Sequence, residues 1–302
     1  MANDNSTTAI KHIFCPTDLS PNSQKALGFA TRLADDLSAQ LTACHVLRAQ
    51  WFSPKIEVLD NRKEIEEKMQ GTILNCSGEP ASDLRWRASV IDNSFDPSRD
   101  ILNLAKETKV DLIVMKARPG VMSAFRFGSI VERVVAASPC PVLLFPTRFL
   151  DSHEPAVDGL HFERILFDYD FSQATDDLYH VVRSMSDGLS ARLDVLSVLE
   201  PAVERTPVFA GTGDNRSVLQ SAVMRKLDNV LAADSRANVP VNAAVEWGDR
   251  AQTVLQYAAD HNTDLVCTTL SPPYHSFEKF YSIYLGQLLK TAKCPILVKQ
   301  SV

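Results

Sequence analysis

Two aspartates in matching sequence contexts are the residues best placed to do chemistry. Asp18 follows a short apolar run at residues 12–16, and Asp170 follows a similar run in the second half of the chain. Apolar runs of this length predict buried strands. An aspartate just past such a strand can accept hydrogen bonds from a ribose hydroxyl or an adenine amine. Asp18 and Asp170 are therefore the first candidates for ligand contact.

A basic segment and a glycine–serine pair follow a later apolar run in the first half. The basic residues are Lys116, Arg118 and Arg126, and the pair is Gly128-Ser129. Free backbone N–H groups at a helix start hold phosphate, and basic side chains can do so by charge. The sequence thus indicates a phosphate contact, and the alternative is an ordinary solvated basic loop.

Evidence for catalysis in the sequence is confined to one short pattern. Asp168 and Asp170 form a D-x-D that resembles the start of a metal-dependent phosphatase, but Tyr169 lies between them and the accompanying loop is degenerate. The chain has no Ser-His-Asp order, HExxH motif, Walker loop or GxGxxG motif, and its six cysteines form no CxxC pair. We expect a protein that is not an enzyme, with a nucleotide-hydrolysing or phosphoryl-transfer enzyme as the alternative.

The chain contains an internal repeat with a period of about 150 residues. Three pairs of segments match: 18–20 with 170–172, 96–114 with 249–267, and 140–143 with 294–297. A unit of this size can bury its own core. We therefore expect two homologous domains, 1–150 and 151–302, with a polar linker at 147–160.

The elements that must position the candidate residues alternate between strand and helix. Strands are predicted at 12–16, 41–47, 84–91, 112–115 and 141–145, and in the second domain around Leu166, Val195, Val245, Val266 and Leu297. Helix-length segments separate them, which implies parallel pairing. The predicted fold class is α/β: two similar doubly wound domains, each a five-stranded parallel sheet with helices on both faces.

Composition restricts the partners. The formal net charge is −6, and hydrophobic and charged residues make up 45% and 23% of the chain. The acidic balance argues against nucleic acid, and no apolar run reaches the roughly 20 residues of a membrane span. The polar N-terminus is not typical of a signal peptide, and the cysteines are predicted to be small buried hydrophobic residues. We expect a cytoplasmic protein.

Four segments of the first domain carry a family resemblance: PTDLS, DLIVMK, GSIVERVV and SPCPVLLF. They are similar to the universal stress protein (UspA) family, and the resemblance covers nearly the whole chain, once per domain. It implies the adenine nucleotide alpha hydrolase-like fold. The family has ATP-binding and non-binding groups, and binding members carry an aspartate after strand one and a G-x2-G-x9-G-[ST] loop.

The resemblance carries over to five positions of the first domain. Asp18 matches the aspartate that faces adenine and ribose, Thr17 is its neighbour, and Val46 falls where a strand-two residue lines the adenine. Gly128 and Ser129 match the closing glycine and serine that hold phosphate. The resemblance thus implies a contact surface for ATP or AMP in this domain.

The first two glycines of that loop are missing. Lys116 and Pro119 stand in their places, and proline removes a backbone donor where the family uses amides. Lys116 and Arg118 could replace those amides by charge. We expect at most weak adenine-nucleotide binding in domain 1 and no certain cofactor.

The second domain departs further from the loop pattern. Thr269 and Pro272 occupy the glycine positions, Gln287 follows Gly286 in place of serine, and an aromatic insert lies at 274–281. This domain is expected not to bind nucleotide.

The resemblance also suggests function and assembly. It implies a regulatory or protective stress-response protein. Family members typically dimerise through strand five, so the two domains are expected to form an intramolecular pseudo-dimer involving Leu143 and Leu297. A further homodimer and a protein partner, met through the aromatic insert, are compatible with this reading.

Overall fold

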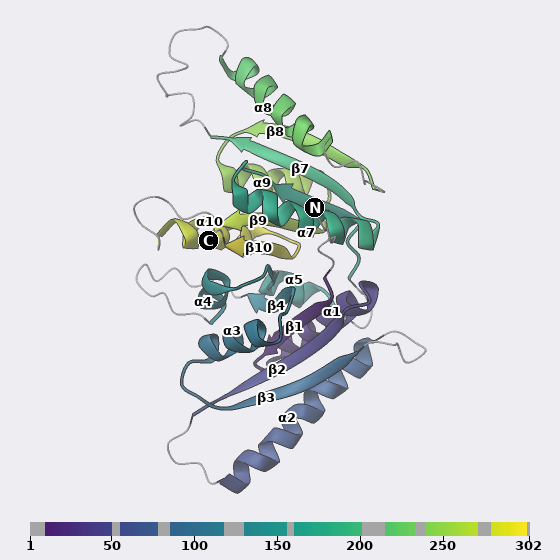
Figure 1. Ribbon diagram of the computed structural model, residues 1–302, viewed down its shortest axis with the longest axis vertical. Helices are drawn as coiled ribbons and strands as arrows, with labels where there is room; N and C mark the ends of the chain where they lie inside the picture. Colours follow the sequence, from purple (N-terminus) through teal and green to yellow (C-terminus); the bar gives the residue numbers. More distant parts are fainter. Residues whose placement is uncertain are drawn as a thin grey trace, which may run out of the picture. The chain divides into compact units, whose positions relative to one another are not determined.

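The computed structural model describes residues 10–49, 55–77, 85–117, 130–155, 160–200, 215–232, 239–270 and 279–300. The chain divides into two compact units (Figure 1). One comprises Ala9–His161 with Pro295–Gln300, and the other is built on Phe162–Cys294.

The first unit is organised around a sheet with strand order β3-β2-β1-β4-β5-β10. Its strands are β1 (His12–Thr17), β2 (Gln40–Arg48), β3 (Trp86–Ser94), β4 (Leu112–Ala117), β5 (Val142–Pro146) and β10 (Ile296–Gln300). The first five are mutually parallel, and β10 runs antiparallel to β5. Since β1 lies beside both β2 and β4, side chains at the carboxyl ends of these strands meet at one edge.

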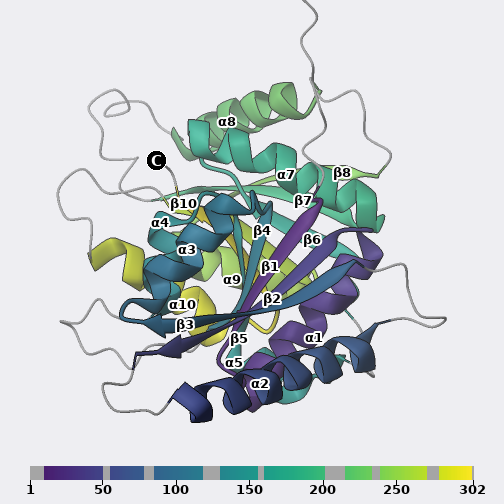
Figure 2. The same ribbon diagram turned by 60° about the horizontal axis from the view of Figure 1, so that its bottom comes forward.

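Four helices connect these strands: α1 (Pro21–Asp36), α2 (Lys55–Cys76), α3 (Pro97–Glu107) and α4 (Ile130–Ala137). Right-handed crossovers place α1 and α2 on one face and α3 and α4 on the other. The contacts agree, because α1 packs against α2 and α3 packs against α4 (Figure 2). Both faces of the sheet are therefore covered, as the apolar character of its strands predicts.

Helix α1 begins and packs as its sequence dictates. Ser20 is the N-cap and Pro21 opens the first turn, where a missing N–H costs nothing. Leu27, Ala30 and Ala34 recur at helical spacing and are each 0% exposed. This stripe forms the contact of α1 with the sheet.

The segment after β5 differs from the predicted linker. Residues Thr147–Ser152 form a short helix, α5, in which Phe149 and Leu150 are buried. The Phe149 ring lies 5.3 Å from Phe29 and 5.6 Å from Phe145, between ring centroids. The segment resembles a linker because it contains many polar residues. The burial of the Phe149 ring nevertheless holds it on the first unit.

The second unit repeats the pattern. Strands β6 (Arg164–Asp168), β7 (Arg192–Leu199), β8 (Val241–Trp247) and β9 (Leu265–Leu270) form a parallel sheet of order β9-β6-β7-β8. The helices are α7 (Gln173–Leu189), α8 (Asn215–Ala232), α9 (Arg250–Asp260) and α10 (Lys279–Thr291). Every strand centre expected in the second domain lies within a strand. The predicted α/β class, with two doubly wound repeats, is confirmed.

Strand β10 is the last strand of the second repeat, yet it is grouped with the first unit. Its antiparallel ladder with β5 places Leu297 opposite Leu143, the two positions expected at a strand-five pairing. Both side chains are 0% exposed. The ladder covers a strand edge of β5 that would otherwise present unpaired N–H and C=O groups.

The cysteines are buried. All six are free thiols in the structure, at positions 15, 44, 76, 140, 267 and 294. Burial raises the pKa of the Cys44 thiol to about 12, which keeps it protonated and unreactive. This agrees with their reading as small hydrophobes. Among the described residues, no helix is both long and apolar enough to cross a membrane.

Candidate functional site

The same turn follows the first strand of each repeat. Leu19 has a φ of 58° and Phe171 a φ of 60°, a left-handed conformation that costs a side chain about 1 kcal/mol. Asp18 Oδ1 accepts from the backbone N–H two residues on at 3.1 Å, and Asp170 Oδ1 does so at 3.0 Å. The aspartate thus stabilises the strained turn that carries it and is held at the carboxyl end of its strand.

In the first repeat the Asp18 carboxylate is paired with Lys116. The Lys116 ammonium donates to Asp18 Oδ1 at 2.8 Å and to Oδ2 at 2.6 Å, and it also donates to Ser20 Oγ. The pairing is possible because β4 lies directly beside β1 in the sheet. The side chains are 14% exposed for Lys116 and 58% for Asp18. An ion pair this open to water contributes at most about 1 kcal/mol.

The pair sets the ionisation of the aspartate. Partial burial alone would raise the pKa of the Asp18 carboxyl, but hydrogen bonds from Lys116 and Ser20 outweigh it and lower that pKa to about 2. Asp18 is therefore a carboxylate at neutral pH, and its charge is balanced within the chain.

The remaining first-repeat candidates lie around this pair. The Thr17 hydroxyl donates to Ser23 Oγ at 3.0 Å, and the Thr17 carbonyl lies 2.8 Å from His45 Nδ1. Thr17 is 5% exposed, so its side chain serves the turn. Val46 lies on β2 one residue beyond His45 and is partly buried. The structure brings Thr17, Asp18 and Lys116 together at one edge, with Val46 on the adjoining strand.

Four sequence candidates cannot be placed. Arg118, Arg126, Gly128 and Ser129 lie outside the described residues, as do Pro119, Pro272 and residues 274–278 of the aromatic insert. The expected contacts of Arg118, Gly128 and Ser129 with phosphate stay predictions. Lys116, expected to hold phosphate, is bound to Asp18 in the structure.

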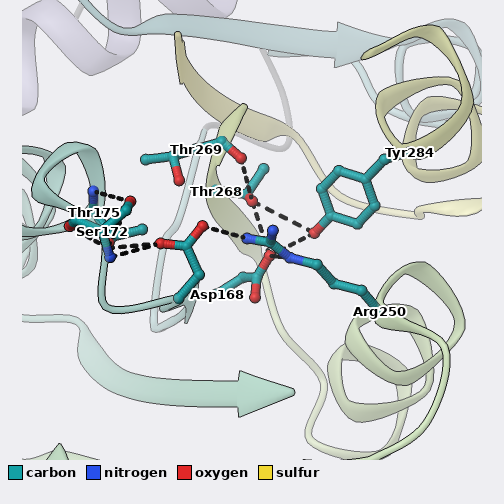
Figure 3. A network of polar contacts seen from close by, with 8 residues as sticks. Asp168, Ser172, Thr175, Arg250, Thr268, Thr269 and Tyr284 are labelled. Atoms are coloured by element: carbon teal, nitrogen blue, oxygen red, sulfur yellow. Dashed lines mark hydrogen bonds and ion pairs between the residues drawn. The ribbon is translucent and has the colours of Figure 1, made fainter. Parts of the chain in front are cut away.

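The second repeat contains a buried polar network that sequence reasoning missed (Figure 3). Asp168, which is 1% exposed, accepts at Oδ2 from Arg250 Nε at 2.8 Å, from the Thr268 hydroxyl at 2.9 Å and from the Tyr284 hydroxyl at 2.6 Å. Arg250 Nη2 also lies 3.5 Å from Asp170 Oδ2. One guanidinium therefore spans both carboxylates of the D-x-D pattern.

Asp168 raises the pKa of both Arg250 and Tyr284, which keeps Arg250 charged and Tyr284 protonated. Burial disfavours a charged Arg250, yet the attraction of Asp168 raises the pKa of the guanidinium above its ordinary value. Burial, and then the Asp168 carboxylate, raise the pKa of the Tyr284 hydroxyl. Tyr284 therefore remains a hydrogen-bond donor, and its ring lies 5.1 Å from the guanidinium carbon. Removing one member of such a buried pair costs about 3–5 kcal/mol.

The cation that neutralises the strand-one aspartate comes from a different element in each repeat. In the first repeat it is Lys116 of β4, where the second repeat has Thr269. In the second repeat it is Arg250 at the start of α9, where the first repeat has Pro97. Besides the D-x-D pattern, the sequence signal for this network is the replacement of Pro97 by Arg250 within a gap-free repeat.

The closing glycine of the loop pattern, Gly128 in the first repeat and Gly286 in the second, has a different position relative to the last helix of its repeat. In the first repeat, residues 128 and 129 immediately precede α4, which begins at Ile130. Its counterpart Gly286 lies inside α10, which begins at Lys279. Amides inside a helix are already bonded along the chain, so this position offers no free donors to an anion.

Among the residues that the structure describes, no group of three or more His, Cys, Asp or Glu side chains is arranged to hold a metal ion. Asp168 and Asp170 of the D-x-D pattern both contact Arg250. The guanidinium therefore occupies the position between the two carboxylates where a metal ion would have to bind.

Comparisons with known proteins agree with the fold and the repeat. The sequence profile described as Universal stress protein family matches residues 9–146 and again residues 161–299. Universal stress protein YxiE of Bacillus subtilis is 33% identical over 140 residues, which are 42% of this chain and 93% of that protein. A Thermus aquaticus universal stress protein, named for its place in the QAH/OAS sulfhydrylase 3'region, is 32% identical over 142 residues, 44% of this chain and 97% of that protein.

Solved structures match over almost the full length. A universal stress protein from Archaeoglobus fulgidus superposes with a TM-score of 0.67 at 17% identity, covering 97% of both chains. A putative universal stress protein from Pseudomonas aeruginosa gives a TM-score of 0.56 at 12% identity, covering 98% of this chain and 95% of that one. At these identities the similarity concerns the fold.

Proposed function

The chain belongs to the universal stress protein family, and from that membership we propose that it is a tandem, non-catalytic member. It would act as a regulatory or protective protein in stress, with at most weak adenine-nucleotide binding at Asp18 in the first repeat. The observation that supports this most directly is that the aspartate after strand one is neutralised within the chain in both repeats.

The two repeats are proposed to differ in what remains of the site. In the first, the Lys116–Asp18 pair is exposed, so a ligand can displace it at small cost. In the second, Arg250 and Asp168 form part of a buried network. Displacing Arg250 would leave the Asp168 carboxylate buried without its cation. Nucleotide is therefore proposed to bind, if weakly, to the first repeat alone.

The absence of catalysis is proposed from the use that the chain makes of its carboxylates. Asp168 receives three hydrogen bonds at Oδ2, one of them from the cation Arg250, which would have to be displaced before a metal ion could bind this oxygen. Asp18 is held by Lys116 and lowered in pKa, which makes it a poor general base near neutral pH.

The assembly proposal rests on the ladder between β5 and β10. Because β10 pairs with β5 in the same chain, the pairing surface through which single-domain members dimerise is proposed to be satisfied internally. We therefore propose a pseudo-dimeric monomer, and separately that the protein is cytoplasmic; light scattering tests for a further homodimer, and a protein partner stays a proposal.

Isothermal titration with ATP and AMP tests the nucleotide proposal. Wild-type protein should give weak binding that Asp18→Ala abolishes, while the matched variant Asp170→Ala in the second repeat leaves it unchanged. Loss of binding in both variants, or in Asp170→Ala alone, would contradict the assignment to the first repeat. Steady phosphate release from ATP above a metal-free control would instead support an enzyme.

A further inference from the structure

The three hydrogens of the Lys116 ammonium have defined acceptors. They point to both carboxylate oxygens of Asp18 and to Ser20 Oγ. An ammonium has three donors and no acceptor, so this set exhausts its capacity. Lys116 cannot hold another anion while it remains in this position. Both oxygens of Asp18 already accept from Lys116, and Oδ1 also accepts from the Ser20 N–H.

The place where Lys116 is held is not favourable for a cation by itself. Ser20 is the N-cap of α1, and its side chain makes no capping hydrogen bond to the helix. The start of a helix carries a partial positive charge. Lys116 therefore remains beside α1 because of the Asp18 carboxylate, and an anion arriving at this edge would be favoured by both the ammonium and the helix.

The pair in the first repeat can exchange partners, in contrast to the pair in the second. Asp18 is 58% exposed, whereas Asp168 is 1% exposed and has two hydroxyl donors besides Arg250. Water can solvate the Asp18 carboxylate when Lys116 leaves it, so exchange at Asp18 has a smaller desolvation penalty than exchange at the buried Asp168.

We propose that Lys116 is a ligand-exchangeable gate on Asp18, which makes the first repeat selective for the phosphorylated form of its ligand. This inference rests on the proposed nucleotide site. The phosphate of the ligand draws the ammonium away from Asp18, and the freed carboxylate then accepts hydrogen bonds from the nucleoside. An uncharged nucleoside offers Lys116 only neutral acceptors, which are weaker than the Asp18 carboxylate, and it meets a carboxylate whose oxygens already accept from Lys116.

Titration of adenosine and AMP against wild type and Lys116→Met tests the gate. In wild type, AMP should bind more tightly than adenosine. In Lys116→Met, Asp18 is free, so adenosine should gain about fivefold in affinity, the value of an exposed ion pair. AMP loses its partner, and the ratio of the two affinities should fall by more than about fivefold.

Two further variants separate the explanations. Lys116→Arg keeps the charge and should preserve the preference for AMP, and Lys106→Met, which removes an exposed lysine of α3, should leave both affinities unchanged. If wild type binds AMP but Lys116→Met keeps the wild-type ratio, the gate is wrong and the nucleotide site stands. If neither protein binds AMP or adenosine, the proposed nucleotide site fails and the gate with it.

Discussion

Arg250 and Asp168 form the most buried ion pair around the two strand-one turns, with Arg250 Nε 2.8 Å from Asp168 Oδ2 and the Asp168 side chain 1% exposed. The pair joins the start of α9 to the end of β6, and Tyr284 ties α10 to the same carboxylate. Thr268 of β9 donates to it as well, so four elements of the second unit are held by one aspartate.

Replacing Arg250 with methionine should destabilise the protein by about 3–5 kcal/mol, because Asp168 would remain buried without its cation. Urea denaturation should show a lower midpoint. Lys116→Met provides the matched control, since it breaks an exposed pair and should cost at most about 1 kcal/mol. Equal effects of the two variants would contradict the difference in burial.

The Asp18 carboxyl should titrate at an unusually low pH. Its pKa is lowered from 3.8 to about 2 in the folded protein, so it binds protons less readily when folded than when unfolded. Its contribution to stability is therefore present above about pH 4 and is lost as the pH falls toward 2. Carbon-detected NMR of the Asp18 carboxyl measures this directly. Lys116→Met should return the pKa toward its ordinary value, and an unchanged pKa in that variant would show that the ion pair does not form in solution.

Two helical glycines should respond to alanine in opposite directions. A Cβ at Gly28 of α1 would lie 2.6 Å from Pro155 Cγ and 2.8 Å from Cys76 Sγ, so Gly28→Ala should destabilise by roughly 1–3 kcal/mol. Gly71 of α2 has no atom within 4 Å of that position, and Gly71→Ala should stabilise by about 0.5–1 kcal/mol. Thermal unfolding of both variants checks the pair of signs. A neutral Gly28→Ala would mean that Pro155 does not pack on α1.

Light scattering should find one chain per particle at micromolar concentration, because β10 already pairs with β5 within the chain. Leu297→Glu places a charge at a position that is 0% exposed, and it should weaken the ladder and promote association through the exposed edge. Leu74→Glu on α2, where the side chain is 55% exposed, is the control and should remain monomeric. A wild-type dimer that Leu297→Glu leaves intact would contradict internal pairing.

Local features of this protein were predictable from short stretches of sequence. The cap at Ser20 with Pro21, the apolar stripe of α1 and the repeated turn at Asp18 and Asp170 each depend on residues a few positions apart. Hydrophobic periodicity and capping act within one or two turns of a helix, so the sequence alone determined most strands and helices and their order. The internal repeat determined that this order of strands and helices occurs twice in the chain.

The partners of the candidate carboxylates were decided by the tertiary structure. Lys116 and Asp18 are 98 residues apart, and Arg250 and Asp168 are 82 apart. Their meeting depends on which strands are neighbours and on the side-chain direction at each strand end, and no local pattern encodes either. The burial of Phe149 in a segment that reads as a linker has the same origin. The sequence identified the carboxylates. The adjacency of β1 with β4, and of β6 with β9, α9 and α10, assigned them their cations and hydroxyl donors.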